Sequence, residues 1–205
     1  MIANSLEQRV RSHCGEFLCE QIGNKSVTKS VQFSHIITPP NATQDVPEIG
    51  DLKKIYSVFG SLTLYHDVES DEAAFYVAPP SEWRQLNRDF SGWIEGLDEE
   101  EEEELLPPWL ESRIVFGEIP RTGNYILMAT TGAGAGSVFE FEHDGFEFIE
   151  LAPSLASFIE EALCPSASEL LGMASHMRFI TGDSGVQWWI TELRDNEGRV
   201  VRNEP

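Results

Sequence analysis

The sequence predicts an α+β fold in which helices pack around a central, mostly antiparallel sheet. Residues 113–163 follow a β-β-β-β-α pattern, and their connections are short enough for an antiparallel meander. Elsewhere, apolar residues recur at helical spacing in several stretches. Hydrophobic residues make up 41% of the 205-residue chain, which is enough for a packed core and excludes global disorder.

The N-terminal part is expected to form a helix over 5–22, a strand over 27–37 and a helix over 47–59. Asp45 and Glu48 stand at the spacing of a capping box for the second helix. The strand is predicted from strict alternation of large side chains. The residues that give the first helix its spacing are Leu6, Val10, Cys14, Phe17, Leu18 and Ile22.

The middle of the chain begins with two strands, at 61–66 and 73–78, which a short polar connection makes into a hairpin. A long helix is expected over 81–97. Seven consecutive acidic residues follow, at 98–104, and the pair of prolines after them ends any helix. The apolar stripe of the long helix comprises Trp83, Leu86, Phe90, Trp93, Ile94 and Leu97.

The third block has the clearest pattern. Because side chains on a strand alternate between faces, Phe139 and Phe141 are expected to face the core and Glu140 and Glu142 to face water. The expected strands are 113–116, ended by Gly117, then 125–130, 137–142 and 146–151, followed by a helix over 154–163 that packs through Leu155, Phe158 and Ile159.

The C-terminal part is expected to add a short helix, capped by Ser166 and Glu169, and further strands. A turn at 195–198 joins the last two strands as a hairpin. The strands are expected at 177–180, 187–194 and 199–202.

The net charge of the chain limits the kinds of partner that it can bind. The chain carries 35 acidic and 14 basic residues, a formal net charge of −21 at pH 7, and 16 of the acids against four bases lie within 47–104. Nucleic-acid binding needs clustered Lys and Arg, and anionic membranes attract basic segments. The charge therefore disfavours both partners and favours a basic protein.

Three cysteines, Cys14, Cys19 and Cys164, are too few and too scattered for a disulfide framework. We expect buried free thiols in a reducing cytoplasm. Charged residues interrupt any signal-peptide core near the N-terminus, and the chain has no 18-residue apolar run that could span a membrane.

The sequence contains no convincing motif of a catalytic, cofactor or metal site. Gly132, Gly134 and Gly136 have the wrong spacing for a dinucleotide loop and precede a strand, which favours a hairpin. The 182–185 segment (Gly-Asp-Ser-Gly) resembles a serine-protease nucleophile loop but fits a turn better. His–Asp pairs at 66–67 and 143–144 suit local turn bonding. We therefore predict no catalytic, cofactor-binding or metal-binding residues.

The acidic run has two interpretations. Runs of like charge are usually solvated and often mobile. Alternatively, the run is an electrostatic contact for a basic partner, with Trp93 and Trp109 beside it as hot-spot residues. The candidate partner-binding residues are Asp98, Glu99, Glu100, Glu101, Glu102, Glu103, Glu104 and Trp109.

The order of motifs in 113–163 resembles the SUKH superfamily. Members run a small-residue-rich hairpin into a strand that ends in His-Asp and then into an alanine- and phenylalanine-bearing helix. The matching segments here are Phe116-Gly117, 122–127, the glycine-rich turn at 131–136, 137–144 and 151–163. The resemblance extends over 45–163, which leaves 1–44 and 164–205 as an N-terminal helix-and-strand extension and a C-terminal helix and β-hairpin extension.

The resemblance implies a non-catalytic protein-binding domain. Most members are bacterial immunity proteins that neutralise a partner toxin, often a nuclease, and a few are regulatory scaffolds. An anionic protein suits the first role because it can cover a basic cleft. A scaffold of the same fold and an enzyme that uses a buried carboxylate remain alternatives.

Overall fold

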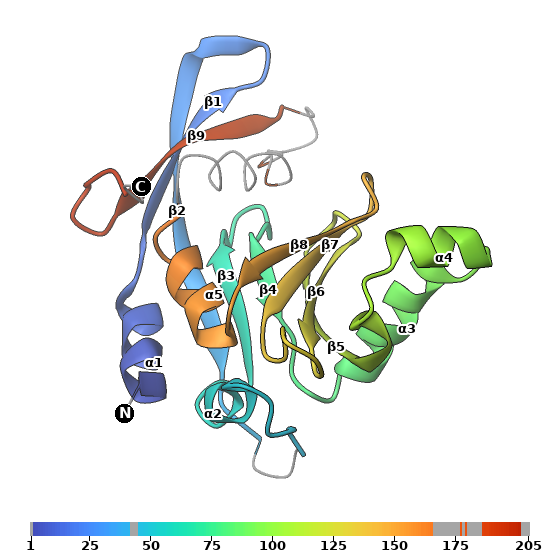
Figure 1. Ribbon diagram of the computed structural model, residues 1–205. Helices are drawn as coiled ribbons and strands as arrows, with labels where there is room; N and C mark the ends of the chain where they lie inside the picture. The colour runs from blue at the N-terminus through green and yellow to red at the C-terminus, as the bar shows by residue number, and fades with distance from the viewer. Residues whose placement is uncertain (1, 42–44, 166–176, 178, 180–185, 202–205) are drawn as a thin grey trace.

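A computed structural model describes residues 2–41, 45–165, 177, 179 and 186–201 of the chain. It shows the expected α+β architecture, with one nine-stranded antiparallel sheet in the order β8-β7-β6-β5-β4-β3-β2-β1-β9 (Figure 1). The strands are β1 (Gly15–Gln21), β2 (Asn24–Thr38), β3 (Ser61–His66), β4 (Phe75–Val77), β5 (Arg113–Ile119), β6 (Asn124–Ala129), β7 (Val138–Glu142), β8 (Glu147–Ala152) and β9 (Trp188–Asp195). The helices are α1 (Ile2–Ser12), α2 (Leu52–Tyr56), α3 (Trp83–Ile94), α4 (Glu99–Leu105), α5 (Leu155–Ala162) and the 3-10 turn η1 (Leu110–Ser112).

The predicted meander of 113–163 is confirmed. Strands β5 to β8 are consecutive antiparallel neighbours, and α5 follows them. The prediction that Gly117 ends the first strand is wrong, because β5 continues to Ile119. A Cβ atom on Gly117 would lie 2.4 Å from the Tyr76 carbonyl oxygen, so the glycine allows β4 to pair closely at this point.

The predicted helix over 5–22 is confirmed as far as Ser12 and wrong beyond it. Helix α1 ends at Ser12, and β1 starts at Gly15. Phe17 and Cys19 are buried while the residues beside them are half-exposed, which is the period of a strand. At Gly15, a Cβ atom would lie 1.9 Å from the Arg194 carbonyl oxygen, so β9 approaches too closely for any other residue.

The helix expected over 47–59 is only the short α2, and Asp45 does not cap it. Instead, Asp51 caps a helix that is distant in sequence. Its carboxylate accepts hydrogen bonds from the backbone N–H groups of Leu155, at 3.1 Å, and Ala156, at 2.8 Å, in the first turn of α5. The α2 region and α5 are thereby held together.

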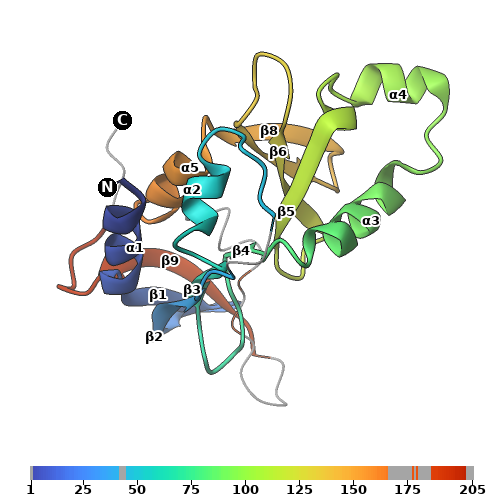
Figure 2. The ribbon, with the colours of Figure 1, turned by 90° about the horizontal axis from the view of Figure 1, so that it is seen from below.

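The sheet has a core on each face. Every residue of β6 is buried, because α1, α2 and α5 cover one core and α3 covers the other. Leu155, Phe158 and Ile159 lie in the first core as predicted. Figure 2 shows α3 on the side of β5 and β6, away from α1, α2 and α5.

The predicted register of β7 is confirmed for its aromatic residues, since Phe139 and Phe141 are both buried. It is wrong for Glu140, which is half-buried and accepts a hydrogen bond from the side chain of Asn124 at 2.6 Å. Burial raises the pKa of the Glu140 carboxyl, and the Asn124 hydrogen bond offsets part of this effect. Glu142 is only partly exposed and accepts backbone hydrogen bonds in the turn that follows.

The three cysteines are free thiols, as predicted, but they are not all buried. Cys19 lies in the core, where burial raises the pKa of its thiol to about 12. Cys164 is half-buried and Cys14 is exposed, because Cys14 falls in the connection between α1 and β1 rather than on a helix face.

In the C-terminal part, β9 matches the strand expected over 187–194 and pairs with β1. The turn at 195–198 is also confirmed, and the Asp195 side chain accepts the backbone N–H groups of Glu197 and Arg199. Beyond it, the strand expected over 199–202 forms only an isolated bridge between Arg194 and Val200 in the described part of the chain. The capping box at Ser166 and the 182–185 loop fall outside the described residues, as do residues 178 and 180 of the strand expected over 177–180.

Tyr65 occupies the centre of the first core with a left-handed backbone, φ 57°, and no exposed surface. Its backbone N–H donates to Nδ1 of His35 on β2 at 3.0 Å, and its hydroxyl donates to the Ala162 carbonyl at the end of α5. A left-handed conformation costs a non-glycine residue about 1–3 kcal/mol. These hydrogen bonds offset that cost.

His35 is also part of a half-buried histidine pair. Its Nδ1 accepts the Tyr65 N–H, so its proton lies on Nε2, which donates to Nδ1 of His13 over 2.8 Å. Both rings are therefore neutral. Burial lowers the pKa of each, and that of His35 falls to about 3. For His13, the Asp195 charge and the Leu163 backbone oppose burial, whereas Arg9 adds to it.

The histidine pair predicts loss of stability in acid. Both pKa values are lower in the fold than the unfolded value of about 6.5, so the unfolded chain binds more protons below that pH. The free energy of unfolding should then fall as pH drops below about 6.5, and His35 alone should contribute about 1.4 kcal/mol per pH unit. Urea unfolding at pH 7, 6 and 5 measures this slope. In the control His35→Asn, the amide oxygen can accept the Tyr65 N–H, so an equally steep slope there would contradict the assignment.

Removing the Tyr65 hydroxyl should also destabilise the fold. Tyr65→Phe leaves the buried Ala162 carbonyl without this donor, at a cost of about 1–3 kcal/mol. The matched control is Tyr76→Phe, whose hydroxyl donates to the exposed carboxylate of Glu82 and should cost less than about 1 kcal/mol. Equal losses of unfolding free energy in the two variants, measured by chemical denaturation, would show that the Ala162 contact stabilises the fold no more than the exposed one.

Candidate protein-interaction surface

The acidic run forms an ordered helix rather than an irregular segment. Asp98 is its N-cap, and its carboxylate accepts the backbone N–H groups of Glu100 and Glu101 at 3.0 Å. Glu101 completes a capping box by accepting the backbone N–H of Asp98 at 3.0 Å. Acidic residues in a first turn also interact favourably with the positive end of the helix dipole. The local sequence therefore explains why α4 begins at Glu99.

The rest of α4 is electrostatically unfavourable. Glu99 and Glu103, like Glu100 and Glu104, are four residues apart, where like charges repel across one turn. Glu104 also lies near the negative end of the helix dipole. In the described part of the chain, none of the carboxylates from Asp98 to Glu104 forms an ion pair. No basic side chain of the described residues therefore pairs with the negative charge of α4.

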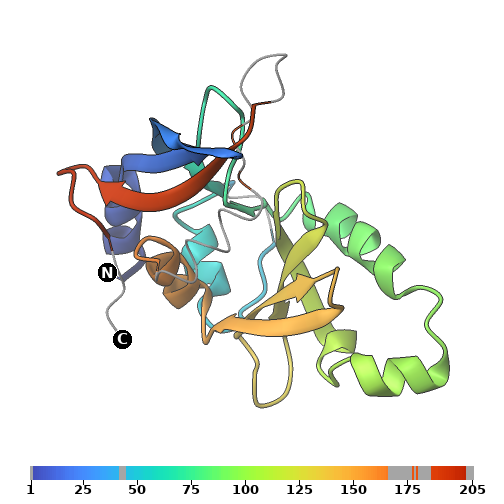
Figure 3. The ribbon, with the colours of Figure 1, turned by 90° about the horizontal axis from the view of Figure 1, so that it is seen from above.

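Helix α4 projects from the body of the protein. None of its residues is buried, and each carboxylate of the run is exposed, as predicted. Figure 1 shows α4 beyond the end of α3, and Figure 3 places it at the opposite end of the molecule from α1 and β9. A partner can approach this helix without meeting the rest of the sheet.

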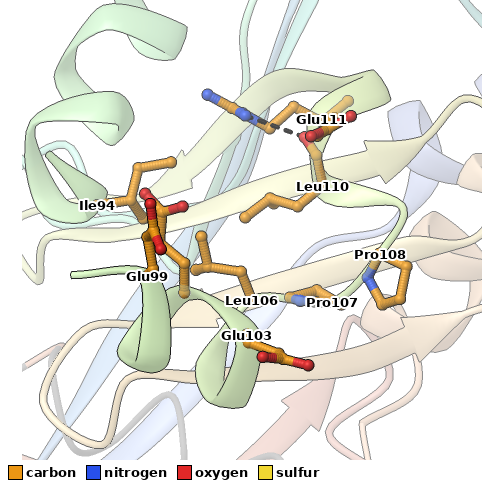
Figure 4. A pocket seen from close by; sticks show the side chains of 10 residues that line it. Ile94, Glu99, Glu103, Leu106, Pro107, Pro108, Leu110 and Glu111 are labelled. Carbon is orange, nitrogen blue, oxygen red and sulfur yellow. Dashed lines mark hydrogen bonds between the residues drawn. The ribbon is translucent and has the colours of Figure 1, made fainter. Parts of the chain in front are cut away.

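A groove of about 560 Å³ lies beside α4. Its floor is apolar and its walls carry carboxylates from α4 and from η1, as Figure 4 shows. The described residues that line it are Ile94, Glu99, Glu102, Glu103, Leu106, Pro107, Pro108, Leu110, Glu111 and Arg113.

The two tryptophans that flank the acidic run differ in position. Trp109 is half-buried and stacks on Phe139, with ring centroids 4.3 Å apart, so it packs onto the sheet and is not one of the groove-lining residues. Trp93 is 41% exposed and contacts His143, with ring centroids 4.8 Å apart. The structure therefore gathers Glu99, Glu102 and Glu103 at the groove but not Trp109, whose binding role remains a prediction.

Sequence reasoning missed the groove itself. The prolines after the acidic run predict only the end of a helix, although Leu106 and Leu110 are apolar residues placed next to exposed charge. Glu111 and Arg113 had no motif to distinguish them. They join the site because η1 and β5 return the chain beside α4, which is a tertiary effect.

An enzyme that uses a carboxylate as a general acid needs one with a raised pKa. Among the described residues outside the groove, Glu118 and Glu140 have raised pKa values. Burial raises the pKa of Glu118, and the nearby charges of Asp89 and Glu82 raise it further. Cross-strand pairing places Glu118 between Tyr76 and Tyr125. Glu140 has its hydrogen bond to Asn124. Neither glutamate is one of the described residues that line the groove.

One cluster of possible metal ligands was found in the described residues. Glu142, His143 and Asp144 bring one ligand atom each to within 4.8 Å of one another. The ring of His143 is already engaged on both sides, with Nδ1 2.9 Å from the Asn124 side-chain oxygen and Nε2 3.0 Å from the Asp144 carboxylate. The Asp144 contact is the local turn bonding that the sequence predicts for a His–Asp pair, whereas Asn124 reaches His143 from β6.

Comparison with known proteins adds no relative: no family model, curated protein or solved structure matches the chain. In the described part of the chain, no helix has the length and apolar character needed to cross a bilayer.

Asp98→Ala should loosen α4 without unfolding the protein. The capping box contributes about 1 kcal/mol to a helix of seven residues that is too short to be stable alone. Amide hydrogen exchange of the α4 backbone should therefore accelerate about fivefold, while the global melting temperature stays constant because α4 buries nothing. A fall of several degrees in the melting temperature would contradict this picture of α4.

Proposed function

We propose that the chain is a non-catalytic protein-binding domain, specifically a SUKH-like immunity protein that binds and neutralises a basic toxin domain in the cytoplasm. The observation that carries the proposal is α4, an ordered and projecting helix whose carboxylates have no ion-pair partner in the described part of the molecule. A protein usually pairs or disperses such charges, so an external cation is the natural complement.

A nuclease toxin supplies the required chemistry. Its active-site cleft must hold Lys and Arg residues that contact phosphates. A helix with carboxylates on successive turns can compete for those cations, and the net charge of −21 adds long-range attraction. The choice of a SUKH-like immunity protein rests on the order of motifs in 113–163 and on the charge.

Affinity purification of the full chain from its native host tests the proposal. We expect one basic protein with a toxic domain to co-elute and its gene to lie directly upstream. Co-expression of the two should give a complex and protect the cell. Recovery of diverse host proteins with no toxin would favour the scaffold interpretation instead. If the upstream toxin domain neither bound the chain nor was neutralised by it, the immunity role would be wrong.

Neutralising α4 should slow association with the partner. Replacing Glu99 to Glu104 by Gln removes charge at the periphery of the molecule, where charges act mainly on the association rate. At low ionic strength we expect a decrease of about tenfold or more in the association rate constant, measured by stopped-flow fluorescence. The decrease should shrink near 0.15 M salt, where the Debye length is about 8 Å.

The control for this experiment is stability. The substituted chain should be as stable as the original or slightly more stable, because repulsion along α4 is relieved. Association rates that match the original at both salt concentrations would identify the run as a solvated surface and would move the interface to the sheet or to α3.

A further inference from the structure

The groove beside α4 differs from the acidic run because it combines charge with an apolar floor. We propose that it receives a lysine or arginine side chain from an extended basic segment of the partner. The inference rests on the proposed function and specifies which part of the surface holds the partner and by what chemistry.

The floor matches the stem of a long cationic side chain. Leu106 and Leu110 line it together with Ile94 and two prolines. Lys and Arg bury their methylene stems against apolar surface while the charged end stays in a polar environment. A small inorganic cation would gain nothing from such a floor, and the one cluster of possible metal ligands in the described residues lies at 142–144, outside the groove.

The walls match the charged end of that side chain. Glu99, Glu102 and Glu103 come from α4, and Glu111 comes from the opposite side, on η1 (Figure 4). A cation between these walls has carboxylates on two sides, and charge-assisted hydrogen bonds are about twice as strong as neutral ones. The groove therefore offers both parts of a lysine or arginine site.

The groove's own cation does not neutralise these walls. Among the described residues that line it, Arg113 is the only basic one. Its guanidinium donates to the Leu110 carbonyl at 2.9 Å and to the Ser91 hydroxyl at 2.9 Å, and it lies over the ring of Phe90. Arg113 forms no ion pair with any described residue. Its hydrogen bonds thus go to neutral groups, and the carboxylates remain available.

The size of the groove indicates a peptide segment rather than a single ion. Its volume of about 560 Å³ lies within the range of about 300–1,000 Å³ that is usual for ligand pockets. One side chain would fill only part of it, so the adjoining residues of the segment would contact the rest of the lining, including Pro107 and Pro108.

Peptide titration of the full chain tests the groove directly. The probe is a fluorescein-labelled hexapeptide of alternating Arg and Gly, followed by anisotropy at low salt and at 0.15 M. The groove pair Glu103→Gln with Glu111→Gln should weaken binding about tenfold. The control pair Glu100→Gln with Glu104→Gln removes the same charge from the same region but lies outside the groove lining, and should change binding less than about twofold.

The ligand has a matched control as well. Citrulline in place of arginine keeps the shape of the side chain and removes its charge, so binding should fall at least tenfold. Equal weakening by the two glutamate pairs would overturn the inference, because it would show a diffuse acidic field. Citrulline binding as tight as arginine binding would also overturn it and would indicate an apolar occupant.

The experiments distinguish a failure of the groove inference from a failure of the proposed function. If the peptide binds in the groove but purification yields no basic partner, the function is wrong and the groove stands. If a toxin partner binds the Glu103→Gln/Glu111→Gln chain as tightly as the original chain, the partner does not use the groove and this inference is wrong, while the function stands.

Discussion

The buried contacts of Tyr65 hold together parts of the chain that lie far apart in sequence. Through its backbone and its hydroxyl, the residue joins β2, β3 and the end of α5, and its ring also contacts Phe17 and Phe33. The left-handed backbone of Tyr65 costs conformational free energy, which these contacts offset. Without these contacts, Tyr65 would no longer link the N-terminal strands to α5. The Asp51 side chain also holds α5 in place, at the N-terminal end of the helix.

The second core has a separate role, since it fixes the base from which α4 projects. Phe90 on α3 packs against Tyr125 and Phe141 of the sheet, and Arg113 of β5 lies over the same ring. This anchoring holds α3 to the sheet, while α4 contributes nothing to the core. Substitutions in the charged helix should therefore leave the packing of the second core unchanged.

The sequence predicted those parts of the fold whose signals are local. The β5–β8 meander and α5 were predictable because strand alternation, short turns and the helical spacing of Leu155, Phe158 and Ile159 agree with one another. The 14–22 segment was not, since its apolar residues fit a helix as well as a strand, and only its pairing with β2 and β9 decides between them. The Asp98 capping box was readable from its spacing but was obscured by the charge of the run. The groove required the return of η1 and β5 beside α4, which no local pattern records.

The position of β9 has a consequence for synthesis on the ribosome. Strand β1 pairs with β2 on one side and with β9 on the other, although Gly15 and its partner Asp195 stand at opposite ends of the chain. At a translation rate of about 5–20 residues per second, that flank of β1 stays open for roughly ten to thirty seconds. A nascent chain with an unpaired strand flank is exposed to wrong pairing with other chains. Translation speed and chaperone supply should therefore affect the yield of this protein more than its final stability would suggest.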